Sequence, residues 1–259
     1  MMLDLTSSVH KTFALLEYFT TQKSEWGVTE LSKEIGASKS TVFRFLAQMQ
    51  SIGILDKDAL TEKYRLGLKL FELGNRVELK SAFIEKTHPQ LESVAVEITE
   101  TVHIAVLKNH QVFYVDKVES PHGLRISSDI GSYNPAYATA LGKVLLAHLA
   151  QKEQQNALDF IYDKNTIKSY TNSTITQKAQ MTLEMDKIVI DKYAIDREEF
   201  ETGLICVAIP IFNKKQQVVA SLSASGPASR FKEKEIKKYV DILQKGANHI
   251  KEKIGYFKL

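Results

Sequence analysis

Short hydroxyl side chains and two cations lie within one seven-residue stretch: Ser38, Lys39, Ser40, Thr41 and Arg44. The hydroxyls suit phosphates and base edges, and Lys39 can reach either group. Arg44 can bind a phosphate or, through both guanidinium nitrogens, the edge of a guanine. No acidic residue occurs between Gly36 and Ser51, so this stretch carries a local charge of +2. The pattern is typical of a helix that lies in the major groove of DNA.

Three helices are expected to position these side chains. Ser7 or Ser8 can cap the first, whose apolar residues recur at steps of three and four. Gly36 suits the turn after the second, because glycine tolerates a positive φ angle. Ser38 is expected to cap the third helix by accepting from an amide two or three residues on, and Gly53 to end it. The expected helices cover 9–20, 29–34 and 39–53.

A hairpin pattern follows the third helix. Apolar Ile54 and Leu55 and the segment 64–66 flank a polar stretch, 56–63, which predicts two short strands joined by a polar tip. Helices followed by such a wing make a winged helix-turn-helix, which we expect to span residues 1–66. Three basic side chains of the wing could contact the DNA backbone or the minor groove: Lys57, Lys63 and Arg65. Helix-turn-helix units also serve as packing modules, so binding of a protein stays an alternative.

Small and polar residues recur in the second half of the chain. Thr139, Ala140 and Leu141 are expected in the first turn of a helix, where free amides and the helix dipole favour an anion such as a small carboxylate. Gly142 would permit the close approach of another backbone segment. The alternative is a helix of small residues that packs tightly on a sheet and binds no ligand.

Three serines alternate along one expected strand, so they face the same side of it: Ser221, Ser223 and Ser225. Their neighbours Ala220, Leu222 and Ala224 face the other side. If the hydroxyl side faces a cavity, it supplies donors for a polar ligand. If it faces solvent, it has no such meaning.

Cys206 is the one cysteine of the chain. A buried cysteine most often behaves as a small apolar residue. A nucleophile would need a partnered histidine, and a zinc site could draw on His103 and Asp196, but no local motif supports either role. We therefore expect no catalytic residue, no metal and no cofactor, with a metal on His103, Asp196 and Cys206 left as an open alternative.

Composition limits the class of protein. With 259 residues, 44% hydrophobic and 25% charged, the chain suits two domains of ordinary size. The net charge of +3 is slight, so any nucleic-acid footprint must be local. A single cysteine fits a reducing compartment, and no signal peptide or membrane-spanning run is evident. These features predict a cytoplasmic protein without a membrane partner.

The rest of the chain predicts an α+β fold. A short helix is expected over 67–74, with Leu68, Phe71 and Leu73 buried, and a longer one from Val77 to Ile98 with an interruption near Pro89; together they form a helical linker, 67–100. Trp26 and Gly27 are expected to close a loop. Period-two patterns and turns then predict an antiparallel sheet with flanking helices over 101–259. Expected strands are 102–107, 112–115, 124–130, 204–212 and 218–225, with turns at 109–110 and 213–217, and expected helices are 135–149, 153–161, 181–192 and 232–254.

The chain resembles the IclR family of bacterial transcription regulators over nearly its whole length. Three stretches carry the resemblance: VTEL to SKSTVFRFL at 28–46, ATALGKVLLA at 138–147, and DREEFETGLICVA at 196–208 together with SASGP at 223–227. The resemblance implies a GAF-like effector-binding domain joined by a helical linker to the winged helix. It also implies homodimers, often paired into tetramers on DNA.

The resemblance further implies which residues contact an effector. Asp196, Cys206, Ser223 and Ser225 fall on effector-contact positions of the family, Ala140 and Leu141 on its helix-terminus loop, and Leu204 on an apolar wall. Family members commonly carry a glycine where Ala140 stands, and Leu141 is bulkier than the usual small residue. The pocket is therefore expected to be tighter or more apolar, and no particular effector can be carried over.

These patterns together predict a ligand-responsive transcription regulator, a repressor that reads a pseudo-palindromic operator in double-stranded DNA. A small organic acid would change DNA affinity by binding one dimer geometry better than another. The alternative is a cytoplasmic enzyme or sensor that uses Cys206 or a serine, although no nucleophile elbow, P-loop or dinucleotide fingerprint is present. The effector, the operator and the choice between dimer and tetramer are not fixed by these patterns.

Overall fold

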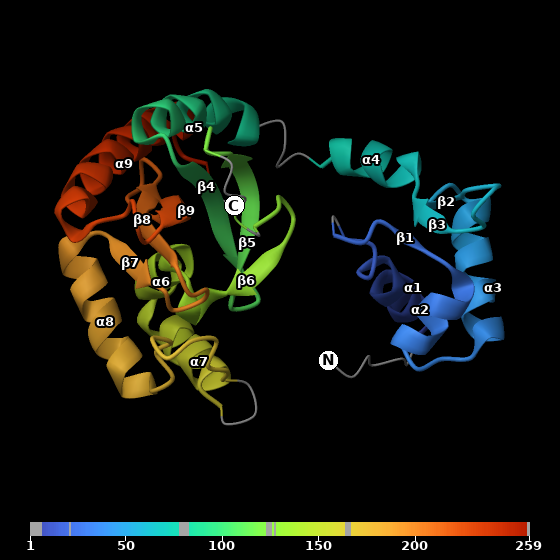
Figure 1. Cartoon of the computed structure of the whole chain (residues 1–259). Helices are drawn as coiled ribbons and strands as arrows, with labels where there is room; N and C mark the ends of the chain where they lie inside the picture. Colours follow the sequence, from blue (N-terminus) through green and yellow to red (C-terminus); the bar gives the residue numbers. More distant parts are fainter. Residues whose placement is uncertain are drawn as a thin grey trace. The chain divides into compact units, whose positions relative to one another are not determined.

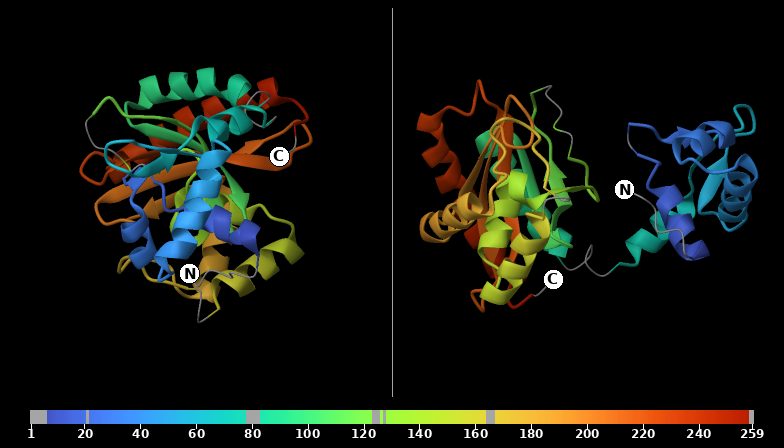
Figure 2. Two further views of the ribbon diagram at one scale, coloured as in Figure 1. Left: turned by 90° about the vertical axis from the view of Figure 1, so that its right-hand side faces the viewer. Right: turned by 90° about the horizontal axis from the view of Figure 1, so that it is seen from below.

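The computed structural model describes residues 7–20, 22–77, 83–122, 126, 128–163 and 167–257. The chain divides into two units, Met1–Glu78 and Leu79–Leu259, each with its own apolar core (Figures 1 and 2). In the described part of the chain, no helix is both long and apolar enough to cross a membrane.

The first unit is built on three helices: α1 (Ser8–Leu16), α2 (Val28–Glu34) and α3 (Lys39–Ser51). The caps follow the prediction, since the Ser7 side chain accepts from the amide of His10 and Ser38 Oγ accepts from the amide of Thr41 at 3.2 Å. Gly36 makes the turn between α2 and α3 with a φ angle of +68°. The helix-turn-helix prediction is confirmed.

The predicted wing is present and gains one strand. Its sheet has the order β1-β3-β2, made of Glu25–Trp26, Tyr64–Leu66 and Leu55–Lys57. The prediction that Trp26 only closes a loop is wrong, because Trp26 pairs with Tyr64 and its indole N–H donates to the carbonyl oxygen of Tyr18 at 2.8 Å. A two-residue strand is too short to leave a period-two pattern in the sequence.

The helix after the wing, α4 (Leu68–Asn75), corrects a second prediction. Its apolar residues are not buried: Leu68 is 80% exposed and Phe71 is 68% exposed, and Leu73 is exposed as well. Helical spacing identifies an apolar face but cannot show whether another element of the same chain covers it. The predicted linker, 67–100, is divided between the two units, because α5 (Glu85–Ile98) packs into the second.

α5 also runs unbroken through Pro89, so the interruption predicted near that residue does not occur. Pro89 is the fifth residue of the helix, and only the hydrogen bond that its missing N–H would have made to Glu85 is lost. The start of this helix predicted at Val77 cannot be compared, since residues 78–82 lie outside the described residues.

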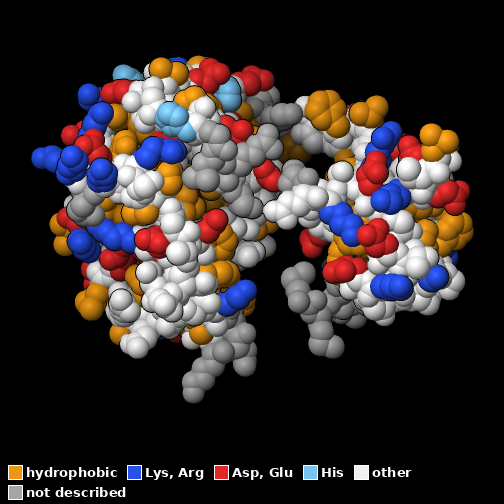
Figure 3. Space-filling view, viewed as in Figure 1, with side chains coloured by type: hydrophobic (Ala, Val, Ile, Leu, Met, Phe, Trp, Pro, Cys, Tyr) orange, Lys and Arg blue, Asp and Glu red, His pale blue; other side chains and the backbone are white. Residues whose placement is uncertain are grey.

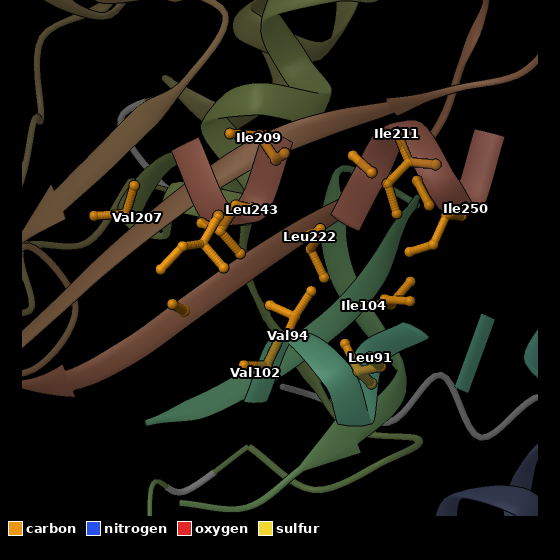
Figure 4. Close-up of a cluster of buried hydrophobic side chains, with 14 of the residues drawn as sticks. Leu91, Val94, Val102, Ile104, Val207, Ile209, Ile211, Leu222, Leu243 and Ile250 are labelled. Carbon is orange, nitrogen blue, oxygen red and sulfur yellow. The ribbon is translucent and has the colours of Figure 1, made fainter. Parts of the chain in front are cut away.

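The second unit is a six-stranded antiparallel sheet in the order β6-β5-β4-β9-β8-β7. Helices α5 and α9 cover one face, and α6, α7 and α8 lie on the other (Figures 1 and 2). Figure 4 shows Leu91 and Val94 of α5 and Leu243 and Ile250 of α9 directed toward Leu222 and other strand residues in the larger core. The elements are β4 (Thr101–Lys108), β5 (Gln111–Val118), β6 (Tyr133–Pro135), α6 (Ala140–Ala147), α7 (Gln151–Ile161), α8 (Lys178–Asp191), β7 (Ala194–Arg197), β8 (Leu204–Phe212), β9 (Val218–Pro227) and α9 (Glu233–Ile254).

Most predicted elements of this unit are confirmed, and three differ. The strand predicted over 124–130 lies partly outside the described residues, and its described residues, 126 and 128–130, are not in a strand; β6 pairs with β5 instead. The helix predicted over 135–149 is divided into a 3₁₀ turn, Ala136–Ala138, and α6, separated by the extended residue Thr139. Strand β7 was not predicted, because it is only four residues long and its second half, Asp196 and Arg197, begins a polar motif.

Candidate functional site

Helix α3 turns one face into the core and the other to solvent. Val42, Phe45 and Leu46 are buried, whereas Lys39 and Arg44 are exposed. Neither Lys39 nor Arg44 forms an ion pair with any described residue, so both charges remain available to an external anion. On the face shown in the space-filling view, Lys and Arg side chains of this unit alternate with Asp and Glu rather than forming one large patch (Figure 3).

A surface groove brings part of the predicted DNA-binding set together. Its lining includes Lys39, Ser40 and Phe43 of α3, the wing residues Lys57 and Lys63, and the start of α2. We call this the helix–wing groove. Helix α3 and the wing thus present a shared surface, which two separate sequence motifs could not establish.

The other predicted contacts have different surroundings. Ser38 caps α3 and its hydroxyl lies 2.8 Å from Thr41 Oγ1, so both hydroxyls already have partners within the turn. Lys57 pairs with Glu62 at 3.0 Å. Arg65 lies outside the groove, with Glu25 and Asp56 opposite it in register on the two neighbouring strands, so acidic neighbours offset its charge.

Phe43 was missed as a site residue by the reasoning from sequence. It is 52% exposed and lines the helix–wing groove, although it is large and apolar. The available signal was its position three residues after Ser40, which places both residues on one face of a helix.

All eight side chains predicted to contact an effector line one cavity of the second unit. They come from four elements: Thr139, Ala140 and Leu141 at the start of α6, Asp196 on β7, Leu204 and Cys206 on β8, and Ser223 and Ser225 on β9. His103, Tyr114, Ser128, Asn134 and Phe200 are among the residues that complete the wall. The cavity is tight, with a volume of about 20 Å³, which is of the order of the space for one water molecule.

Strand pairing explains why these residues meet. Asp196 lies opposite Cys206, and Cys206 lies opposite Ser225, so three neighbouring strands place a carboxyl, a thiol and a hydroxyl in one row. On the next strand, His103 lies opposite Ser223. The serine side of β9 faces this cavity, while Leu222 and Ala224 of the same strand belong to the core under α9.

Two polar atoms of the cavity wall, His103 Nδ1 and Ser223 Oγ, make no hydrogen bond within the described part of the protein. His103 Nε2 lies 2.7 Å from Ser128 Oγ, so only one side of the ring is satisfied. Burial, aided by the charge of Lys117, lowers the pKa of His103 to about 3, which keeps the ring neutral. A buried polar atom without a partner costs about 1–3 kcal/mol, so a ligand that pairs with these atoms gains affinity.

Asp196 is one of two acidic residues that line the cavity, the other being Glu201. Burial raises the pKa of Asp196 to about 7, and the nearby charge of Glu199 adds to the effect. The main-chain N–H of Glu199 donates to Asp196 Oδ1 at 2.7 Å and works in the opposite direction. The carboxyl group therefore changes charge near neutral pH, inside the cavity.

Lys143 supports this part of the cavity from α6. Its fully buried ammonium donates to the carbonyl oxygen of Ile195 at 2.6 Å, to Glu199 Oε1 at 2.6 Å and to Glu184 Oε1 at 3.2 Å. Gly142 beside it is also required, because a Cβ atom there would lie 2.2 Å from the carbonyl oxygen of Ala136. The predicted close approach at Gly142 is confirmed, whereas the role of Lys143 was not foreseen.

Replacing Asp196 with asparagine is expected to change how stability depends on pH. The folded protein holds the Asp196 proton up to about pH 7, whereas an unfolded chain releases it near 3.8. The folded state therefore binds more protons between these values, and this group lowers the free energy of unfolding as pH rises through that window. At about 1.4 kcal/mol for each pKa unit, the effect reaches about 4 kcal/mol.

Urea unfolding between pH 4 and pH 8 measures this pH dependence of the free energy of unfolding. His103, whose pKa is lowered by folding, contributes a slope of opposite sign to the free energy of unfolding against pH. Glu199, whose pKa is raised, contributes a slope of the same sign as Asp196. The test is therefore the difference in slope between wild type and Asp196→Asn. The exposed Asp186→Asn is the matched control. Identical pH slopes for Asp196→Asn and wild type would show that folding does not raise the pKa of the Asp196 carboxyl.

The environment of Cys206 keeps its thiol protonated. Burial raises the pKa of the Cys206 thiol, which opposes the thiolate that a nucleophile needs. Within the described ranges, no group of three or more His, Cys, Asp or Glu side chains is arranged to hold a metal ion. What the wall offers is a set of hydrogen-bonding groups around a small apolar space, which suits reversible binding of a small molecule.

Comparison with known proteins identifies the family of both units. A family model of the IclR helix-turn-helix domain matches residues 8–59, and one of the bacterial transcriptional regulator IclR C-terminal domain matches residues 79–252. The HTH-type transcriptional regulator KdgR of Escherichia coli K12 is 38% identical over 253 residues, covering 98% of this chain and 94% of KdgR.

Solved structures have the same architecture. The IclR protein of Thermotoga maritima superposes with a TM-score of 0.78 at 30% identity, covering 96% of this chain and 99% of that one. An IclR homologue of Microbacterium hydrocarbonoxydans, crystallised with 4-hydroxybenzoate, has a TM-score of 0.83 at 21% identity, covering 96% and 99% of the two chains. The second likeness shows the fold only. The matches to both family models and to KdgR show that this chain belongs to the IclR family of DNA-binding transcription regulators.

Proposed function

We propose that this regulator is a repressor whose affinity for a DNA operator is controlled by a small organic acid. One observation carries the proposal: all eight residues implicated in effector contact line a single cavity, in a different unit from the exposed cationic face of α3. The two activities thus have separate structural elements. Repression needs only that the protein occupy an operator, whereas activation would need a further contact with the transcription machinery.

On the DNA side, α3 enters the major groove and the wing lies along the backbone. Lys39 and Arg44 supply cations that no described side chain neutralises, and Ser40 lies beside them on the exposed face. Ser38, Thr41, Lys57 and Lys63 make supporting contacts with phosphates. Arg65 contributes least, because its cross-strand neighbours Glu25 and Asp56 are acidic.

On the ligand side, the start of α6 receives the carboxylate of the acid. The Thr139 side chain accepts from the amide of Gly142, which leaves the amides of Ala140 and Leu141 to face the cavity end of the helix. Ser223 Oγ and His103 Nδ1 supply further polar contacts. The Microbacterium relative in fold was crystallised with 4-hydroxybenzoate, which is also a small organic acid.

A second copy of the chain completes the regulator as a homodimer. The exposed apolar side chains of α4, visible as the apolar atoms over that helix in Figure 3, together with Val9 and Phe13 of α1, become shielded from solvent when a partner covers them. Two recognition helices related by a two-fold axis read a pseudo-palindromic operator. Because the cavity holds only about 20 Å³, an acid must widen it, and that difference between two conformations is what can alter DNA affinity.

A mobility-shift assay on the DNA upstream of the protein's own gene tests this function, combined with a panel of small organic acids. We expect one acid to release the DNA and to raise the melting temperature of the protein. Ser223→Ala is expected to keep DNA binding and to lose the response to the acid. Ser221→Ala is the matched control, because Ser221 donates to the carbonyl oxygen of Ile209 at 2.9 Å and does not line the cavity.

The two halves of the proposal fail separately. A protein that never retards the upstream DNA contradicts its role as a regulator of that site. DNA binding that no acid alters, together with melting temperatures that no acid raises, contradicts control by an organic acid.

A further inference from the structure

Phe43 has an exposure that packing within the first unit does not explain. It is 52% exposed, while its helix neighbours Val42 and Phe45 are almost completely buried. Within the described part of the chain, its ring stacks on no other aromatic ring. A half-exposed phenylalanine gives up part of the free energy that burial of its ring would contribute, about 25 cal/mol for each Å² of apolar surface.

The surroundings of Phe43 favour DNA over an apolar partner. The helix–wing groove that it lines also contains Lys39, Ser40, Lys57 and Lys63, and Arg44 follows it directly. The two acids of the groove are already paired: Glu30 lies 2.6 Å from the ammonium of Lys23, and Glu62 lies 3.0 Å from that of Lys57. Lys39 and Lys63 form no ion pair with a described acid, and the lining of the groove contains three lysines against two glutamates, so its net charge is positive.

The major groove offers a phenylalanine one apolar group on a base edge, the C5 methyl of thymine. A ring that can neither donate nor accept a hydrogen bond gains from contact with this methyl. Opposite a cytosine, the ring would instead cover the amino group of the base and remove it from water without a hydrogen-bond partner, which costs free energy. We propose that Phe43 is a specificity-determining residue that reads a thymine methyl in each operator half-site. The inference rests on the proposed function, in which α3 enters the major groove.

Methyl deletion on the DNA tests this pairing directly. Duplexes that bind the full-length wild-type protein are first selected from a random library, and each thymine of a selected duplex is then replaced by deoxyuridine, which lacks the methyl. We expect one thymine in each half-site at which deoxyuridine weakens wild-type binding about fourfold, the equivalent of one methyl group at about 0.8 kcal/mol.

The double-mutant cycle with Phe43→Ala isolates the pair. Phe43→Ala is expected to bind the thymine duplex several-fold more weakly and to lose its discrimination between thymine and deoxyuridine at that position. Phe43→Leu, which keeps an apolar side chain, is expected to retain part of the discrimination. Phe160→Ala removes an exposed phenylalanine of α7 in the other unit and is expected to behave as wild type.

Three results would overturn the inference. In the first, Phe43→Ala discriminates deoxyuridine as strongly as wild type does. In the second, no thymine methyl affects wild-type binding, although a defined sequence is selected. In the third, Phe43→Ala weakens binding to all duplexes equally and changes the sedimentation coefficient, which would place Phe43 in an interface between copies of the chain. Failure of the wild-type protein to select any sequence would instead overturn the proposed function itself, and this inference with it.

Discussion

Replacing Lys143 with methionine is expected to lower the free energy of unfolding of the second unit by about 3–5 kcal/mol, the usual cost of removing one partner from a buried ion pair. The Lys143 ammonium is fully buried and serves Ile195, Glu199 and Glu184 at once. Methionine keeps the length of the side chain, so the loss is one of charge and hydrogen bonds rather than of volume.

The cost arises from the group that is left behind. Without the ammonium, Glu199 has no cation within reach of Oε1, and its Oε2 already lacks a hydrogen-bond partner among the described residues. Burial already raises the pKa of Glu199, and the loss of Lys143 raises it further, because that charge is what lowers it. Glu199 would therefore take up a proton. The main-chain segment that carries Asp196 would lose its hydrogen bonds to Lys143 of α6.

Urea and thermal unfolding of full-length Lys143→Met measure this effect. The double variant Lys143→Met with Glu199→Gln is expected to recover part of the loss, because no buried charge is then left unpaired. Lys178→Met, which removes a partially exposed partner of Asp159, is the matched control and should change stability little. An unchanged midpoint for Lys143→Met would mean that the buried ion pair contributes nothing over an apolar side chain.

The combined change of Lys39 and Arg44 to alanine is expected to weaken binding to the operator by about 30-fold or more. An arginine that reads a guanine is worth about 1–3 kcal/mol, and the proposed homodimer would present two of them. Binding to phosphates adds to this, and the salt-dependence slope falls by about 0.9 for each phosphate that the variant no longer neutralises. Both side chains are exposed on α3 and form no ion pair with a described residue, so the fold should not change.

Titration of a labelled operator at several salt concentrations measures both the affinity and the slope, and circular dichroism checks that the variant is folded. Lys187→Ala removes an exposed lysine from α8 of the other unit and should leave both quantities unchanged. If the double variant binds DNA as tightly as wild type, the winged helix serves a different purpose, and recognition of a protein becomes the better explanation of its exposed face.

Much of this protein follows from patterns within short stretches of its sequence. Ser38 was correctly predicted as a helix cap and Gly36 as a turn, and Ser7 was one of two candidates for the first cap, because each property depends on only a few neighbouring residues. The turn at Asn109 and His110 was predicted for the same reason, and both residues have the positive φ angles that a tight hairpin requires. The α+β class followed from the change of apolar period near residue 101.

The tertiary structure decided which predicted surfaces are covered and which distant residues meet. The same helical spacing that buries α5 leaves Leu68 and Phe71 of α4 exposed, because spacing defines a face but not what packs on it. Lys143 resembles an ordinary surface lysine in the sequence, and only its ion pair with Glu199, 56 positions away, shows why it can be buried. The cavity of the second unit likewise exists only where the start of α6 meets side chains from all six strands of the sheet. Contacts between residues far apart in the sequence depend on how the whole unit packs. Short-range sequence patterns carry no information on that packing.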